Sequence, residues 1–182
     1  MKYLSLFSLL FCLFLINCQK KEVFQPVYQS KSEYLKESRE YSKSREDSER
    51  KYLQQWVNKQ RDSLQHQFEP TSSGIWMRFL TKNNKPAAKT DDRIVYSAEI
   101  KTLSNEVIYT STEFGTKEGI LGKFNEVRGI ESALYKMGKG DTTELLLPSF
   151  TAYGLYGDEK KIGANVPLVV ELTLLDIKSA SN

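Results

Sequence analysis

The sequence predicts an α+β fold, in which an antiparallel sheet wraps a short helix and a long charged helix precedes both. Two observations predict this class. Between residues 75 and 177, apolar and polar side chains alternate in short runs separated by turn residues, which is typical of half-buried strands in an antiparallel sheet. Residues 31–67 instead contain neither Gly nor Pro, and their apolar residues recur at helical spacing.

The composition fits one globular domain with extensions and argues against a nucleic-acid binder. A length of 182 residues and an apolar share of 40% are enough to build one core. The net charge is only +3, and acidic residues interrupt the clusters of Lys and Arg, whereas nucleic-acid binding needs a basic stripe. We therefore expect no nucleic-acid partner.

Residues 1–17 have the pattern of an export signal. Lys2 precedes an apolar run that is too short to span a bilayer as a permanent helix, and the run ends in LINC at residues 15–18. This ending resembles a bacterial lipobox, which implies a diacylglycerol on the sulfur of Cys18 and cleavage just before it. The alternative is an ordinary signal peptide, or a buried apolar segment, in which the cysteine occurs by chance. Lipidation predicts anchoring to a membrane of the cell envelope, with the periplasmic face of the outer membrane as the expected place.

Residues 18–30 are polar and are interpreted as the lipidated cysteine and a tether, and residues 31–68 as a charged helical extension. A narrow apolar stripe runs along this extension. Its members are Tyr34, Tyr41, Tyr52, Leu53, Trp56, Val57, Leu64 and Phe68. The stripe has to pack on the following domain or on a second copy of the chain. It disappears between Ser42 and Lys51, where we allow for a break, and the many charges are interpreted as a solvated helix face.

A separate domain is predicted at residues 70–178. Pro70 and Gly74 end the helical region. A short helix is expected at residues 129–137, closed by Gly138 and Gly140. The expected strands cover residues 75–79, 94–100, 107–109, 142–147 and 167–177.

Three segments in the second half of the chain carry the most specific patterns. Residues 127–141 read VRGIESALYKMGKGD, residues 147–154 read LPSFTAYG, and residues 162–174 read IGANVPLVVELTL. In this order and spacing they resemble V-I-x-G-W-E-x-A-L-x-x-M-x-x-G-E, I-P-P-x-x-A-Y-G and I-P-P-N-x-x-L-x-F-x-V-E-L of the FKBP-type peptidyl-prolyl isomerases. The likeness covers about residues 90–178. Together with the lipobox and the charged helix, it makes the chain most similar to the gliding-motility-associated FKBP lipoproteins of Bacteroidetes-type bacteria.

The resemblance implies a prolyl-isomerase site. Tyr153 takes the place of the tyrosine whose hydroxyl bonds a substrate carbonyl, and the backbone N–H of Val127 takes the place of the donor at the helix entry. Ile108 and Ile162 fall at positions that line the pocket, Ile108 in place of an aromatic ring. The alternative for Tyr153 is a structural tyrosine at a sheet corner.

The pocket is expected to be wider and poorer in aromatic rings than is usual for the family. Ile130 stands in place of a tryptophan floor and Val170 in place of a wall phenylalanine, although plain core is the alternative for these positions and for Ile108. Tyr109 occupies the position of the pocket aspartate, so we expect the pocket to lack its carboxylate. The family has a tyrosine in one strand of the pocket, and Ala98 stands at its position if the alignment with the family contains no gap. Tyr96 stands at that position if the alignment shifts by two residues.

The sequence lacks the residues that other kinds of catalytic or metal site would need. His66 is the only histidine and lies in the polar helix, so neither a Ser/His/Asp arrangement nor a His-rich metal site is expected. A Gly-rich phosphate loop between a strand and a helix is also missing. The sequence therefore predicts no cofactor and no metal.

We predict a peptidyl-prolyl isomerase that assists the folding of exported proteins, with proline-containing polypeptides as its clients. One alternative is an FKBP fold kept as a binding module without useful turnover, which the loss of aromatic rings favours. Another alternative makes the N-terminal helix the active part, through self-association or docking to an envelope complex.

Overall fold

The computed structural model describes residues 30–61, 67–123 and 126–179. The chain divides into two compact units, residues 1–40 and 41–182. The predicted export signal, Cys18, Leu64 and His66 lie outside the described residues. Among the residues that are described, no helix is both long and apolar enough to cross a membrane.

Helix α2 covers Lys31–Arg61. Ser30 begins it, because the Ser30 carbonyl and hydroxyl oxygens both accept a hydrogen bond from the backbone N–H of Glu33, at 2.9 and 3.3 Å. The break that we allowed for between Ser42 and Lys51 is wrong, since these residues are continuously helical. In the first unit, the described residues of α2 are all exposed.

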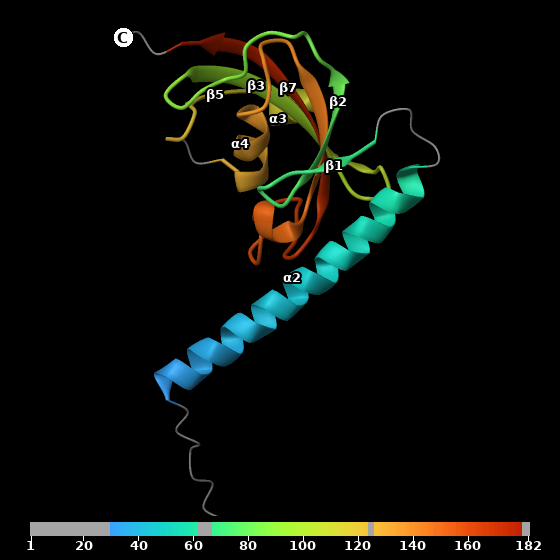
Figure 1. Ribbon diagram of the computed structural model, residues 1–182, viewed down its shortest axis with the longest axis vertical. Helices are drawn as coiled ribbons and strands as arrows, with labels where there is room; N and C mark the ends of the chain where they lie inside the picture. The colour runs from blue at the N-terminus through green and yellow to red at the C-terminus, as the bar shows by residue number, and fades with distance from the viewer. Residues whose placement is uncertain (1–29, 62–66, 124–125, 180–182) are drawn as a thin grey trace, which may run out of the picture. The chain divides into compact units, whose positions relative to one another are not determined.

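Seven strands form one antiparallel sheet in the second unit, which confirms the predicted fold class (Figure 1). The strands are β1 (Glu69–Pro70), β2 (Trp76–Thr81), β3 (Arg93–Lys101), β4 (Val107–Tyr109), β5 (Thr116–Ile120), β6 (Thr142–Leu147) and β7 (Leu168–Lys178). Their order is β1-β2-β6-β7-β3-β4, and β5 pairs with β3 beside β4. Among the strands, β3, β6 and β7 carry most of the buried apolar residues.

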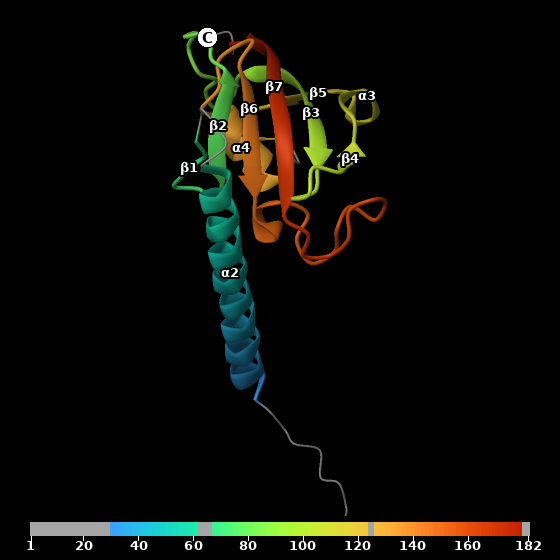
Figure 2. The same ribbon diagram turned by 90° about the vertical axis from the view of Figure 1, so that its right-hand side faces the viewer.

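Helix α4 (Arg128–Leu134) packs against one face of the sheet, and Figure 2 shows it behind β2, β6 and β7. Its Ile130, Ala133 and Leu134 are buried in the main core together with Leu145 and Leu147 of β6. Glycine at position 129 allows this contact, since a Cβ atom there would lie 2.6 Å from Leu147 Cδ2. The helix can therefore approach the strand this closely only without a side chain at its second residue.

The other face of the sheet is covered from residue 53 of α2 onward. Leu53 and Val57 are buried, and Trp56 packs against the same cluster. The sheet side of this cluster consists of Phe68, Trp76, Leu146 and Val169. Successive strand residues point to opposite faces, so Leu145, Leu146 and Leu147 are all buried only because both faces are covered. The predicted stripe thus packs on the domain from residue 53 onward.

Three members of the stripe do not pack on the domain, since Tyr34, Tyr41 and Tyr52 are exposed. Four short elements were also missed. They are β1, β5, helix α3 (Ser111–Phe114) and the 3-10 helix η1 (Ser149–Thr151). A sequence signal existed for α3, since Thr110 and Glu113 form a capping box with the usual three-residue spacing.

Candidate active site

All seven residues predicted for the pocket lie in or against one apolar cluster. Ile130, Ile162 and Val170 are buried in it. The others are partly buried and pack against it; they are Ile108, Tyr109, Val127 and Tyr153. These residues come from β4, the start of α4, β7 and the loop between β6 and β7. The fold therefore brings together segments that lie up to about 60 residues apart in the sequence.

Tyr153 lies just after η1, in the loop between β6 and β7. Burial raises the pKa of its hydroxyl to about 12, and the nearby negative charges of Glu126 and Asp158 add to this rise. The hydroxyl is therefore a neutral donor throughout the physiological pH range. Its oxygen has no hydrogen bond to any other described residue. Tyr153 is thus a half-buried donor that remains available.

The backbone N–H of Val127 is engaged by the side chain of Glu126. Val127 is the N-cap residue of α4, and its N–H donates to Glu126 Oε1 at 2.8 Å. The second oxygen of the same carboxylate accepts from Lys117 Nζ at 2.9 Å and from the Tyr96 hydroxyl. The Glu126 side chain is only 6% exposed. Sequence reasoning missed Glu126, because a single carboxylate before a helix carries no distinctive pattern.

Tyr96 is one of the two positions that the sequence left open for the strand tyrosine, and it is buried in the same apolar cluster as the site residues. It is 1% exposed, and its ring lies 6.3 Å from the Phe114 ring, centroid to centroid. A register shift between Val95 and Tyr96 interrupts the pairing of β3 with β7. Burial, followed by the hydrogen bond to Glu126, raises the pKa of Tyr96 well above the usual range. Ala98 is buried on the same face of β3, two residues on.

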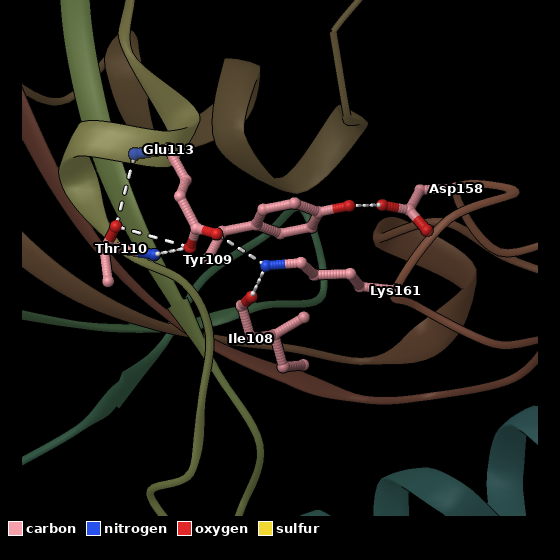
Figure 3. A network of polar contacts seen from close by, with 6 residues as sticks. All are labelled: Ile108, Tyr109, Thr110, Glu113, Asp158 and Lys161. Carbon is pink, nitrogen blue, oxygen red and sulfur yellow. Dashed lines mark hydrogen bonds and ion pairs between the residues drawn. The ribbon is translucent and has the colours of Figure 1, made fainter.

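A carboxylate is present beside Tyr109, so the expectation of a pocket without one is wrong. Figure 3 shows the Tyr109 hydroxyl donating to Asp158. Asp158 Oδ1 also accepts from the backbone N–H groups of Ile162, at 2.7 Å, and Lys160, at 3.0 Å. Tyr109 comes from β4 and Asp158 from the loop between β6 and β7, so the two residues meet only in the folded chain.

The pKa values of the two partners follow from this pairing. The hydrogen bond to Asp158, followed by burial, raises the pKa of Tyr109. Burial by itself would raise the pKa of Asp158, but the bonds from Tyr109 and from backbone N–H groups outweigh it and lower that pKa. At neutral pH the pair is therefore a phenol that donates to an ionised carboxylate.

Lys161 ties β4 and α3 to the same loop. Its ammonium group donates to the Ile108 carbonyl at 3.2 Å and to Glu113 at 2.7 Å (Figure 3). It also lies 4.9 Å from the centroid of the Tyr109 ring. The side chains of Lys161 and Glu113 are both about half exposed. Their ion pair therefore contributes little to the stability of the fold, and its main effect is to orient the loop.

Ile130 and Val170 are fully buried and lie beneath the site as part of the core. Tyr153, Tyr109 and Ile108 are partly exposed above them. Within the described residues, no group of three or more His, Cys, Asp or Glu side chains is arranged to hold a metal ion. The site therefore offers hydroxyl donors and carboxylates over an aliphatic core.

Comparison with known proteins agrees with this geometry. A family model for FKBP-type peptidyl-prolyl cis-trans isomerases matches residues 84–175. Curated protein sequences contain no match.

Three similar solved structures share the fold. A peptidyl-prolyl cis-trans isomerase from Pseudomonas syringae pv. tomato is 22% identical with a TM-score of 0.57, over 73% of this chain and 96% of that one. FkpA from Escherichia coli is 19% identical with a TM-score of 0.57, over 85% and 76%. The N-terminal domain of FKBP42 from Arabidopsis thaliana is 15% identical with a TM-score of 0.54, over 61% and 93%. The family match covers half of the chain and includes all seven predicted pocket residues, so this chain belongs to the FKBP-type peptidyl-prolyl cis-trans isomerase family.

Proposed function

We propose that this isomerase acts on proline-containing segments of exported proteins at the cell envelope, with Tyr153 as the donor that holds a client carbonyl. The observation that carries the proposal is the Tyr153 hydroxyl, which is half buried, neutral and free of partners among the described residues. Such a donor loses no internal hydrogen bond when a client binds.

The chemistry needs neither a nucleophile nor a metal, because no covalent bond is made or broken. The barrier to rotation about a peptide bond is about 18–20 kcal/mol. In the twisted state the amide loses conjugation and becomes less polar, so an apolar environment favours that state over the planar one. The aliphatic residues under Tyr153 supply this environment, and a fixed donor on a flanking carbonyl restricts the orientation of the client.

One observation favours the alternative of a binding module with weak turnover. The N–H of Val127, which we propose as the second donor, is held by Glu126 in this structure. A client carbonyl reaches that N–H only after the carboxylate leaves. The structure thus provides two donors. The Tyr153 hydroxyl is available at once, whereas the N–H of Val127 becomes available only after a client displaces the Glu126 carboxylate.

The test is the isomerisation of a short proline peptide by the full mature chain. We expect Tyr153→Phe, which removes only the hydroxyl, to lower kcat/KM by about tenfold, the equivalent of one ordinary hydrogen bond. Tyr156→Phe is the matched control, because Tyr156 lies three residues on and is 85% exposed. Equal turnover in both variants would remove Tyr153 from the mechanism, and no turnover in the folded parent chain would favour the binding module.

We also propose that a lipid on Cys18 anchors the chain to a bacterial membrane, in the manner of gliding-motility lipoproteins. The LINC ending of the apolar leader supports the proposal. Labelling with a palmitate analogue should mark the parent chain in cells and leave Cys18→Ala unlabelled. If the parent remains unlabelled, there is no lipid anchor. Loss of colony spreading after deletion of the gene would support a role in motility, and normal spreading would oppose it.

Self-association through helix α2 is a further proposal, supported by the exposure of Tyr34, Tyr41 and Tyr52. Sedimentation of the mature chain measures its mass directly. A dimer that becomes a monomer on replacement of these three tyrosines by serine would support it, whereas a monomeric parent chain would contradict it.

A further inference from the structure

The loop between β6 and β7, residues 148–167, carries Tyr153 outside the sheet. Two backbone hydrogen bonds fix the residue that follows Tyr153. The N–H of Gly154 donates to the Ser149 carbonyl at 2.8 Å, and the Gly154 carbonyl accepts from the N–H of Asn165 at 2.7 Å. Ser149 and Asn165 lie near the two ends of the loop. The position of Tyr153 therefore depends on where these two residues are held.

Helix α2 contacts both of them. The two carboxylate oxygens of Glu49 accept from the N–H and the hydroxyl of Ser149, each at 2.7 Å. Ser149 is 1% exposed and Glu49 is partly buried, so this pair of bonds is partly protected from water. The guanidinium group of Arg45 donates to the side-chain oxygen of Asn165. Hydrogen bonds with an ionised partner are stronger than neutral ones. The contacts of Glu49 and Arg45 should therefore hold the two ends of the loop.

The contacts follow from the spacing of residues on the helix. Arg45 and Glu49 are four residues apart, and the same spacing continues to Leu53 and Val57. Side chains four apart lie on one face of a helix. Leu53 and Val57 are buried against the sheet, so they fix the helix in place. The polar part of the same face then reaches the loop.

We propose that Arg45 and Glu49 are positioning residues, which hold the loop so that Tyr153 stays in its place over the site. The Arg50 guanidinium group, 5.4 Å from the centroid of the Phe150 ring, adds a third contact beside Ser149. The second half of the extension would then be part of the isomerase. The inference rests on the proposed role of Tyr153, but holding the loop can be measured without reference to catalysis.

The experiment compares Glu49→Gln with Asp47→Asn in the full mature chain. Asp47 is exposed on the same helix and has no hydrogen bond or ion pair with another described residue, so it controls for a change of charge. Glu49→Gln keeps the size of the side chain but loses the charge and one acceptor. Arg45→Ala tests the other end of the loop and serves as the second variant should Glu49→Gln lower the yield of folded protein.

Two measurements distinguish the attachment of the loop from its effect on catalysis. Amide hydrogen exchange of residues 149–165 should become about tenfold faster in Glu49→Gln and Arg45→Ala, while exchange in β3 and in Asp47→Asn stays at the parent level. The kcat/KM for a proline peptide should fall by about tenfold in the same two variants. Unchanged loop exchange would overturn the attachment, and faster exchange with unchanged kcat/KM would overturn the positioning role. If Tyr153→Phe alone leaves kcat/KM unchanged, the proposed role of Tyr153 fails while the exchange result still stands.

Discussion

Replacing Glu126 with alanine tests whether this carboxylate competes with the client for the N–H of Val127. The charge-assisted bond between them is 2.8 Å long. A hydrogen bond to a charged group contributes about 1.5–3 kcal/mol, and about 1.4 kcal/mol corresponds to a factor of ten. If the client has to break this bond, its removal should raise kcat/KM per folded molecule by roughly ten- to a hundredfold.

The same change should destabilise the fold. Tyr96 is 1% exposed and donates its hydroxyl to Glu126, so the variant removes this acceptor from a buried hydroxyl. Loss of a buried hydrogen bond costs about 1–3 kcal/mol. Tyr96→Phe combined with Glu126→Ala also removes the hydroxyl, so the double variant should recover part of the stability and keep the higher kcat/KM.

The assay is peptide isomerisation, with activity divided by the folded fraction from urea unfolding. Lys117→Met is the matched control, because it removes one partner of Glu126 and leaves the bond to Val127. The control should lose stability without any rise in kcat/KM. If Glu126→Ala has the parent kcat/KM or a lower one per folded molecule, the competition argument is refuted.

The remaining predictions concern packing and pH. Leu53→Ala should lower the free energy of unfolding by about 2–5 kcal/mol, since Leu53 is fully buried against the sheet, and urea unfolding measures this loss. Because the pKa of Tyr153 is raised to about 12, kcat/KM should show no fall from its ionisation up to about pH 10, and a fall near neutral pH would contradict this assignment. The pKa of Asp158 is lowered, so its stabilising effect should be complete above about pH 4 and disappear as the pH falls through that lowered pKa. Tyr109→Phe removes one of the hydrogen bonds that lower the pKa of Asp158, so the pKa of Asp158 should be higher in this variant. Acid unfolding of the variant should therefore begin at a higher pH than acid unfolding of the parent chain.

Local patterns were sufficient for most of the fold. The alternation in residues 94–100 predicted β3, whose buried residues alternate in the same way. Residues 142–147 were also predicted as a strand, and the last three residues of this strand, β6, are all buried because both faces of the sheet are covered. The exposed edge strand β5 was missed, since Thr116–Ile120 buries no residue and lacks an apolar period. Helix α2 was predicted, but the loss of its apolar stripe after Ser42 was misread as a break.

The site, like the fold, was predicted only in part from the sequence. The family resemblance was enough to predict Tyr153, Tyr109 and Val127 for one site, and they lie in or against one apolar cluster. It could not show that Asp158 faces Tyr109 or that Glu126 holds the N–H of Val127. Both carboxylates have ordinary neighbours in the sequence, and each acquires its partner only when the chain folds.

The sequence by itself determined the fold class and the family, because periodicity and motif spacing are local properties of the chain. Only the tertiary structure decided what the charges of helix α2 do. Glu49 meets Ser149 one hundred residues later, and Arg45 meets Asn165 after one hundred and twenty. A pair of polar residues leaves no periodic trace over such distances, so the sequence presents them as solvated charges, whereas packing of Leu53 and Val57 on the sheet brings them to the loop.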